Sequence, residues 1–196
     1  MTTPYTFHTG SVKIAHNLLQ TLSHILHKAS SSNHQPPTDN GASPTTQPDT
    51  TTLLNARLIH DMFPLSDQIR LATQYTEFIV ARTTDRDPLT YSAPTTFAQA
   101  HEMIDAVVSA AAAADPDTVN RQADVVKMSM LGRDSMAEMR TAEYVHLALL
   151  PNLYFHVTTA YGILRKEGVK LEKWDYYAGF VADLNQARES ASAKAA

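Results

Sequence analysis

The sequence predicts an all-α protein, an antiparallel four-helix bundle with a small β-hairpin before its last helix. Three features predict this fold. Four segments repeat apolar residues at intervals of three and four, which is the spacing of one helix face. A shorter stretch before the last segment alternates apolar and polar residues, as the strands of a hairpin do. With 196 residues, of which 43% are hydrophobic, the chain is long enough to bury one core.

The first helix is predicted over residues 11–29, and residues 1–29 are assigned to this part of the bundle. Its apolar face consists of Ala15, Leu18, Leu22 and Ile25. Residues 30–52 follow, with four prolines and six threonines but no aromatic residue, leucine, isoleucine or valine. Such a segment cannot bury enough apolar surface to offset its chain entropy, so we expect a disordered insert loop.

The second helix is predicted over residues 53–81, with an interruption near Pro64. Its inner face carries Leu65, Ile69, Ala72, Thr76 and Ile79. The third helix begins at a capping box, because Thr96 precedes Gln99 by three residues. Asp115–Pro116 ends this helix, and its inner face carries Phe97, Ala100, Ile104, Val107 and Ala111.

The fourth helix is predicted over residues 141–166, and Gly168 is placed to stop it. Its inner face carries Val145, Leu149, Asn152, His156, Thr159 and Ile163. The hairpin is expected between residues 123 and 139, where the period changes from helical to alternating. Residues 53–185 complete the same domain, and we expect residues 186–196 to form a frayed tail.

Composition excludes several classes of function. The formal net charge is −4, which disfavours bulk electrostatic binding to nucleic acid. Without cysteine, the chain has no disulfide scaffold, thiolate zinc site or cysteine nucleophile. No apolar run approaches the roughly 20 residues of a membrane helix, and the N-terminus lacks the pattern of a secretory signal. We therefore expect a cytoplasmic protein without a membrane or nucleic-acid partner.

Two polar residues lie on the apolar face of the fourth helix. Asn152 and His156 are four residues apart and thus one turn apart on the same side. Burying them without partners would cost roughly 1–3 kcal/mol each. Pro151 removes a backbone donor next to them and is expected to disturb the helix. The pair is either a satisfied core contact beside this irregularity or part of a site.

Asp61 is the second candidate. If the second helix continues through it, Asp61 shares a face with Leu58 and Leu65 and points inward. It could then pair with His156, so that the carboxylate orients the imidazole and raises its basicity. The alternative is that Asp61 caps the helix whose first turn contains Pro64.

Other motifs offer little. The remaining histidines fall mostly on solvated helix faces, and no HExxH metal spacing, GxGxxG, P-loop or GxSxG motif is present. Tyrosine hydroxyls near the last helix could donate hydrogen bonds to a ligand in a pocket. We expect such a pocket to be lined by Tyr154, Tyr161, Thr159, Leu65 and Leu149.

Several of these segments resemble a known family. Leu58–Leu65 (LIHDMFPL), followed by Gln68-Ile69, looks like its second-helix signature. Pro151–Arg165 (PNLYFHVTTAYGILR), followed by Gly168-Val169 and Lys173–Asp175, looks like its last-helix signature. This is the domain-of-unknown-function 1993 family, which is grouped with the DinB/YfiT-like four-helix bundles. The resemblance covers roughly residues 8–30 and 53–180.

The resemblance implies a scaffold whose relatives place three histidines in the bundle and bind a divalent metal, often nickel or zinc. The positions of the last-helix HxxxH pair would be Asn152 and His156, and the second-helix position would be about Asp61. Only one histidine of three is present, and asparagine is a weak neutral ligand. The resemblance therefore implies the fold but neither a tight metal site nor a reaction.

Three functions remain open. The first is a cofactor-free isomerase, dehydratase or cyclase, pericyclic cyclisation included, that acts on an apolar biosynthetic intermediate. His156 would be its acid/base, Asp61 the orienting carboxylate and Asn152 a hydrogen-bond donor. The second is a DinB-like transferase or hydrolase that depends on nickel or zinc. The third is a non-catalytic bundle that binds a small molecule. The Ser/Thr/Pro-rich insert suggests a fungal-like version of the fold, and similar bundles are often homodimers.

Overall fold

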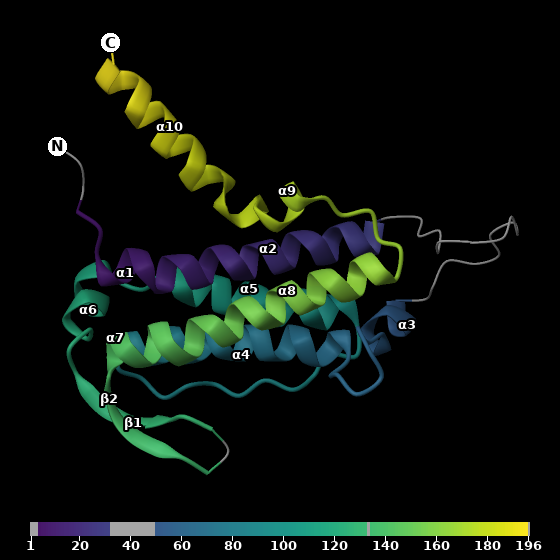
Figure 1. Cartoon of the computed structure of the whole chain (residues 1–196), viewed down its shortest axis with the longest axis horizontal. Coiled ribbons are helices and arrows are strands. Elements are labelled where there is room, and N and C mark those ends of the chain that lie inside the picture. Colours follow the sequence, from purple (N-terminus) through teal and green to yellow (C-terminus); the bar gives the residue numbers. More distant parts are fainter. Residues whose placement is uncertain (1–3, 32–49, 133, 196) are drawn as a thin grey trace, which may run out of the picture.

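The structure is a computed structural model that describes residues 4–31, 50–132 and 134–195. Four long helices pack into a bundle, which confirms the predicted fold (Figure 1). They are α2 (Val12–Ser31), α4 (Leu65–Thr84), α5 (Phe97–Ala112) and α8 (Leu150–Lys166). Shorter helices connect or extend them: α1 (Phe7–Gly10), α3 (Thr50–Asn55), α6 (Pro116–Arg121), α7 (Thr141–Tyr144), α9 (Lys173–Tyr176) and α10 (Val181–Ala195).

The direction of the helices follows from one long connection. After α4, residues 85–96 run back along the same helix, where the Gln74 side chain accepts from the Tyr91 N–H and donates to the Leu89 carbonyl. As a result α4 and α5 point the same way, and each lies antiparallel to another long helix (Figure 1). The antiparallel neighbours are α2 with α5 and α4 with α8.

The predicted inner faces form the core. Every residue predicted for the inner faces of the first three helices is buried, from Ala15 on α2 to Ala111 on α5. Thr96 caps α5 by accepting from the Gln99 N–H at 3.1 Å. The Gln99 side chain accepts from the N–H of Thr95, one residue earlier than a capping box requires. The apolar periodicity of the sequence is therefore explained by burial in the core.

The predicted fourth helix is continuous but changes its winding. It comprises α7, a π-helical turn over Val145–Leu149 (η1) and α8. The Leu150 N–H donates to the Val145 carbonyl, five residues back, just before Pro151. A wider turn accommodates the proline, which cannot donate, without a sharp break. Gly168, with φ of 87°, follows the helix as predicted, in a conformation that favours glycine.

The predicted hairpin is present and consists of β1 (Val126–Met130) and β2 (Met136–Arg140). The strands are antiparallel, with Val126 opposite Arg140 and Met130 opposite Met136. The hairpin covers the end of the bundle where α4 finishes and α7 begins (Figure 1). The Thr141 N–H donates to the Val125 carbonyl and so ties the base of the hairpin to α7.

The C-terminal segment differs from expectation. Residues 186–195, predicted to be frayed, belong to helix α10, which projects away from the bundle (Figure 1). The start of α10 is anchored because Asp183 forms an ion pair with Lys13 and accepts from the Asn17 amide on α2. Once a first turn is fixed, a segment rich in alanine and long charged side chains continues as a helix at little cost.

Two further expectations concern the ends of the insert and the membrane. The predicted disordered loop, residues 30–52, lies mostly outside the described residues. Its described margins belong to α2 and α3. In the part of the chain that the structure describes, no helix combines the length and apolar character needed to cross a bilayer.

Candidate functional site

His156 lies on the buried face of α8, where it meets α4. Its side chain is almost fully covered, with 7% of the residue exposed. Nδ1 of the imidazole is 2.8 Å from Oε1 of Gln68 on α4. The Tyr75 ring stacks nearly parallel to the imidazole, with 5.6 Å between ring centroids. The polar residue on the apolar face therefore has a partner, and that partner comes from α4.

The hydrogen bonds around Gln68 determine the tautomer of His156. The Gln68 amide nitrogen donates to the Phe63 carbonyl at 3.1 Å, so Oε1 is the atom that faces the imidazole. An oxygen only accepts, and Nδ1 of His156 must therefore carry the proton. Burial, with a smaller contribution from Arg70, lowers the pKa of His156 to about 4. At neutral pH the ring is uncharged and Nε2 holds a free lone pair.

Asn152 does not act together with His156. Its amide nitrogen donates to the Ala148 carbonyl of its own helix at 2.8 Å, and the residue is half-buried. The Asn152 side chain thus bonds back to the π-helical turn over Val145–Leu149, which contains Ala148. The polar group of Asn152 is therefore engaged within its own helix.

The prediction that Asp61 points inward to His156 is wrong. Asp61 is exposed in the turn between α3 and α4, because the second helix is interrupted over residues 56–64. The alternative, that Asp61 caps α4, is also wrong, since Pro64 occupies the cap position. The Leu65 N–H donates to the Ala56 carbonyl at 2.8 Å, which closes the intervening residues into a loop on the surface.

The residues predicted to line a pocket lie in different surroundings. Leu65 and Leu149 belong to the closed core, and the Thr159 hydroxyl donates to the Phe155 carbonyl one turn back. Tyr161 packs edge-on against a tyrosine of α9, and Tyr154 is 40% exposed. None of the five lines the cavity described below.

The metal site of the implied relatives does not fit these residues. One nitrogen of His156 is engaged by Gln68, Asp61 lies on the surface, and Asn152 bonds to its own helix. Among the described residues, no three His, Cys, Asp or Glu side chains come together in a way that could hold a metal ion.

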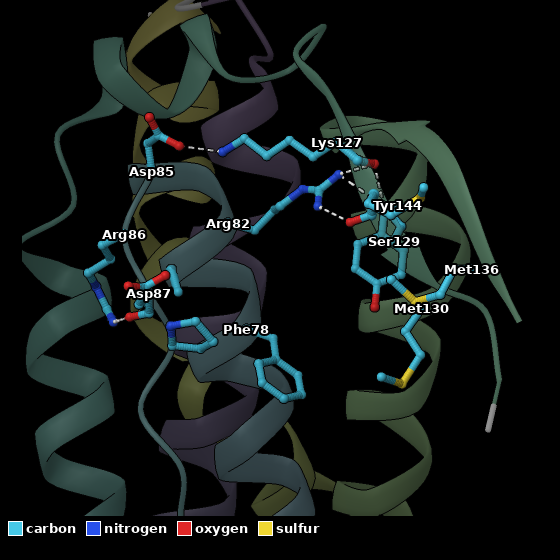
Figure 2. A pocket seen from close by; sticks show the side chains of 13 residues that line it. Phe78, Arg82, Asp85, Arg86, Asp87, Lys127, Ser129, Met130, Met136 and Tyr144 are labelled. Carbon is cyan, nitrogen blue, oxygen red and sulfur yellow. Dashed lines mark hydrogen bonds and ion pairs between the residues drawn. The ribbon is translucent and has the colours of Figure 1, made fainter. Parts of the chain in front are cut away.

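A cavity of about 650 Å³ lies instead beneath the hairpin, between the last turns of α4 and the start of α7 (Figure 2). Phe78 and Tyr144 provide aromatic walls, and Met130 and Met136 extend from the tip of the hairpin. Charged residues line the other end. The full lining comprises Phe78, Ala81, Arg82, Asp85, Arg86, Asp87, Pro88, Lys127, Met128, Ser129, Met130, Met136 and Tyr144.

Arg82 attaches the hairpin to the bundle. Its guanidinium donates to the carbonyls of Lys127 and Met128 on β1 and of Met139 on β2, at 3.1–3.3 Å. Nε and Nη2 also donate to the hydroxyls of Thr141 and Ser129. The guanidinium lies 5.3 Å from the centre of the Tyr144 ring. One side chain of α4 thus holds both strands above the cavity.

Two ion pairs define the charged end of the cavity. Lys127 of β1 pairs with Asp85, the residue that follows α4 with a left-handed φ of 56°. Arg86 pairs with both carboxylate oxygens of Glu77, a residue that is 1% exposed. Glu77 also accepts from the Leu89 N–H at 2.8 Å. These bonds hold the connection after α4 in place and shape one wall of the cavity.

Sequence reasoning did not find this cavity. The available signal was the group of methionines in the predicted hairpin, since Met128, Met130 and Met136 alternate with polar residues. In the structure these three side chains are 56–59% exposed. Exposed methionines close to each other are typical of adaptable binding surfaces.

Comparison with known proteins agrees with the fold. The model of the family described as a domain of unknown function (DUF1993) matches residues 7–177. The chain belongs to this family. The chain is also similar to the crystal structure of a DinB family member protein from Shewanella denitrificans, with 27% identity and a TM-score of 0.70. That match covers 87% of this chain and 90% of the other. No curated protein matches the chain.

Membership of the DUF1993 family and the DinB-like neighbour agree with the predicted resemblance. The family match includes the helices that carry His156 and Gln68 as well as the hairpin. The DUF1993 description assigns no activity, so the chemistry of this chain is argued from its own residues.

Proposed function

We propose that this DUF1993 protein binds a small amphipathic molecule in the cavity beneath the hairpin. The observation that carries the proposal is the cavity itself. Its volume of about 650 Å³ lies within the roughly 300–1,000 Å³ of ligand pockets, and it combines apolar walls with a few polar groups at one end. The proposal requires no metal or cofactor.

The exposed methionines support this proposal. Met130 and Met136 are paired at the tip of the hairpin, more than half exposed, next to Phe78 and Tyr144 (Figure 2). When a ligand covers large apolar side chains at a concave surface, the complex is stabilised by about 25 cal/mol per Å² of apolar area removed from water. Methionine side chains also adapt their shape to a ligand easily.

The proposal is tested with Nile red, a neutral apolar dye whose emission rises in apolar surroundings. Wild-type protein should bind the dye saturably, and Met130→Glu should weaken binding because it places a charge at the cavity. Leu147→Glu is the matched control, since Leu147 is 72% exposed on η1 outside the cavity. Unsaturable binding, or equal loss in both variants, contradicts the proposal.

A second candidate function is a cofactor-free isomerase, dehydratase or cyclase acting on an apolar intermediate, with His156 as its base. One observation favours it, namely a buried imidazole whose orientation is fixed by the Nδ1–H bond to Gln68, which leaves Nε2 as the ring nitrogen for acid/base chemistry. Asp61 has no part in this version, because it lies on the surface.

The second candidate is tested by two measurements. Elemental analysis by plasma mass spectrometry, before and after chelator, should find no stoichiometric metal. His156→Gln should abolish turnover of any substrate found while the folded content, measured by circular dichroism, is retained. One equivalent of nickel or zinc that is lost in His156→Gln would contradict a cofactor-free reaction.

A further inference from the structure

The charges that line the hairpin cavity are not all compensated. Of its three cations, Lys127 is paired with Asp85, and Arg86 is paired with Glu77. Arg82 has no carboxylate partner among the described residues, because its hydrogen bonds all go to backbone carbonyls and hydroxyls. The two ion pairs therefore leave the charge of Arg82 uncompensated on the wall of the cavity.

The guanidinium of Arg82 also retains donor capacity. Nη1 carries two hydrogens, and its one hydrogen bond goes to the Met128 carbonyl. Burial lowers the pKa of Arg82 below its usual value, so the cation is partly removed from water without an anion beside it. A ligand oxyanion near this group would form a charge-assisted hydrogen bond in partly desolvated surroundings.

Asp87 is the remaining anion of the lining and does not cancel this charge. Its side chain is exposed and lies beside Arg86, away from Arg82 (Figure 2). A carboxylate surrounded by water is strongly screened, whereas the half-buried guanidinium is screened less. The local field at the protected part of the cavity therefore has the sign of Arg82.

The Tyr144 part of the aromatic wall disfavours a cationic ligand. Aromatic faces recognise cations, but the face of Tyr144 is already covered by the Arg82 guanidinium at 5.3 Å. A second cation there would meet a like charge. The same wall is suited to an apolar group, since Met130, Met136 and Phe78 lie below the Lys127–Asp85 pair in the view of Figure 2.

We propose that the ligand of the hairpin cavity is an amphipathic anion, whose carboxylate or similar oxyanion meets Arg82 and whose apolar body lies against Phe78, Met130 and Met136. This inference rests on the proposed binding function. It adds the chemical class of the ligand and the residue that selects it.

The test compares three ligands of equal chain length below their micelle concentrations: octanoate, octanol and octylammonium. Each is titrated against the Nile red complex of the full chain, and displacement gives its affinity. Octanoate should bind about tenfold more tightly than octanol, because only its carboxylate forms a charge-assisted hydrogen bond with Arg82. Octylammonium should bind most weakly, because its charge has the same sign as that of Arg82. Added salt should reduce the preference.

The possible outcomes separate the inference from the function on which it rests. Equal displacement by all three ligands supports binding but overturns the role of the anion. Preference for octylammonium also overturns the role of the anion, and it would mean that Asp85 and Asp87 determine the sign of the local electrostatic field. If none of the three displaces a bound dye, or the dye does not bind, the proposed function fails as well.

A pair of variants assigns the selectivity to Arg82. Arg82→Lys retains the charge and should keep the preference for octanoate over octylammonium, although the hairpin is held by fewer bonds. Arg82→Met removes the charge and should abolish the preference. Lys170→Met is the control, because it removes the same charge from an exposed residue that does not line the cavity, and its preference should match that of wild type. A preference that persists in Arg82→Met contradicts the inference.

Discussion

The Nδ1–H group of His156 donates to Oε1 of Gln68 at 2.8 Å, and this bond joins α8 to α4 within the core. Gln68 is held in turn by the Phe63 carbonyl, on the loop that precedes α4. The three residues form one series of hydrogen bonds that satisfies Nδ1 of His156 and both polar atoms of the Gln68 amide. These hydrogen bonds connect the surface loop before α4 to the centre of the bundle.

Replacing Gln68 with leucine should destabilise the protein by about 1–3 kcal/mol, because the imidazole of His156 is then left in the core without its partner. The free energy of unfolding is measured by urea denaturation at pH 7. Gln20→Leu is the matched control, since Gln20 is exposed on α2 and its replacement should change stability by no more than about 0.5 kcal/mol. Equal stabilities of the two variants would contradict the role of this bond.

His156 should make the protein less stable in acid. The folded-state pKa of about 4 lies below the ordinary value of 6.5, so the unfolded chain binds the proton more readily. Stability should therefore be fully present above pH 6.5 and decrease as the pH falls to about 4. The size of the shift corresponds to about 2–3 kcal/mol once partial solvent access is considered.

The same measurement on His156→Gln isolates this effect. Burial also lowers the pKa values of His8 and His101, so they contribute to the pH dependence in the same direction. The difference between wild type and His156→Gln in urea denaturation, from pH 7 to pH 4, belongs to His156 alone. Parallel curves over this range would mean that His156 titrates normally in the folded protein.

Arg82→Lys should loosen the hairpin. A single ammonium group cannot reach the three carbonyls that the guanidinium bonds on β1 and β2. Hydrogen exchange followed by mass spectrometry should show at least about tenfold faster exchange in residues 126–140, while the α2 and α5 amides keep their protection. Arg70→Lys, at a half-buried ion pair with Asp67, serves as control and should leave the hairpin amides unchanged.

Gly179→Ala should detach the C-terminal segment from α2. A Cβ atom at this position would lie 1.9 Å from the Asn17 carbonyl oxygen, a backbone atom that cannot move aside within its helix. We expect a loss of about 1–3 kcal/mol and faster hydrogen exchange in residues 173–183. Gly162→Ala is the control, because its Cβ would contact only the Leu58 side chain at 3.6 Å. Replacing this helical glycine should be neutral or stabilise the protein by up to about 1 kcal/mol.

Most of the fold could be predicted because its signals are local. Apolar periodicity places the inner faces of the helices, Thr96 marks the start of α5, and Gly168 with its positive φ marks the end of α8. These features depend on neighbours within one or two turns. The features that were predicted correctly are those whose interacting residues are close in sequence.

The candidate site could be predicted only in part. His156 was identified because a histidine on an apolar face requires a partner. That partner was expected to be Asp61, but Gln68 lies seven residues further along the chain. The difference arises because the second helix begins at Leu65, so Asp61 lies in a surface turn. A break in a helix changes which side chains face inward, and periodicity alone cannot locate it.

The amino-acid pattern was enough to establish a helical bundle with a hairpin, its inner faces and one buried histidine, since each follows from hydrophobic spacing along the chain. The tertiary structure decided the parallel course of α4 and α5, the pairing of His156 with Gln68, and the cavity beneath the hairpin. These depend on contacts between distant residues, such as Arg82 with Met139, 57 positions apart. No local pattern encodes such a pair, because it forms only when the packed helices bring the two segments together.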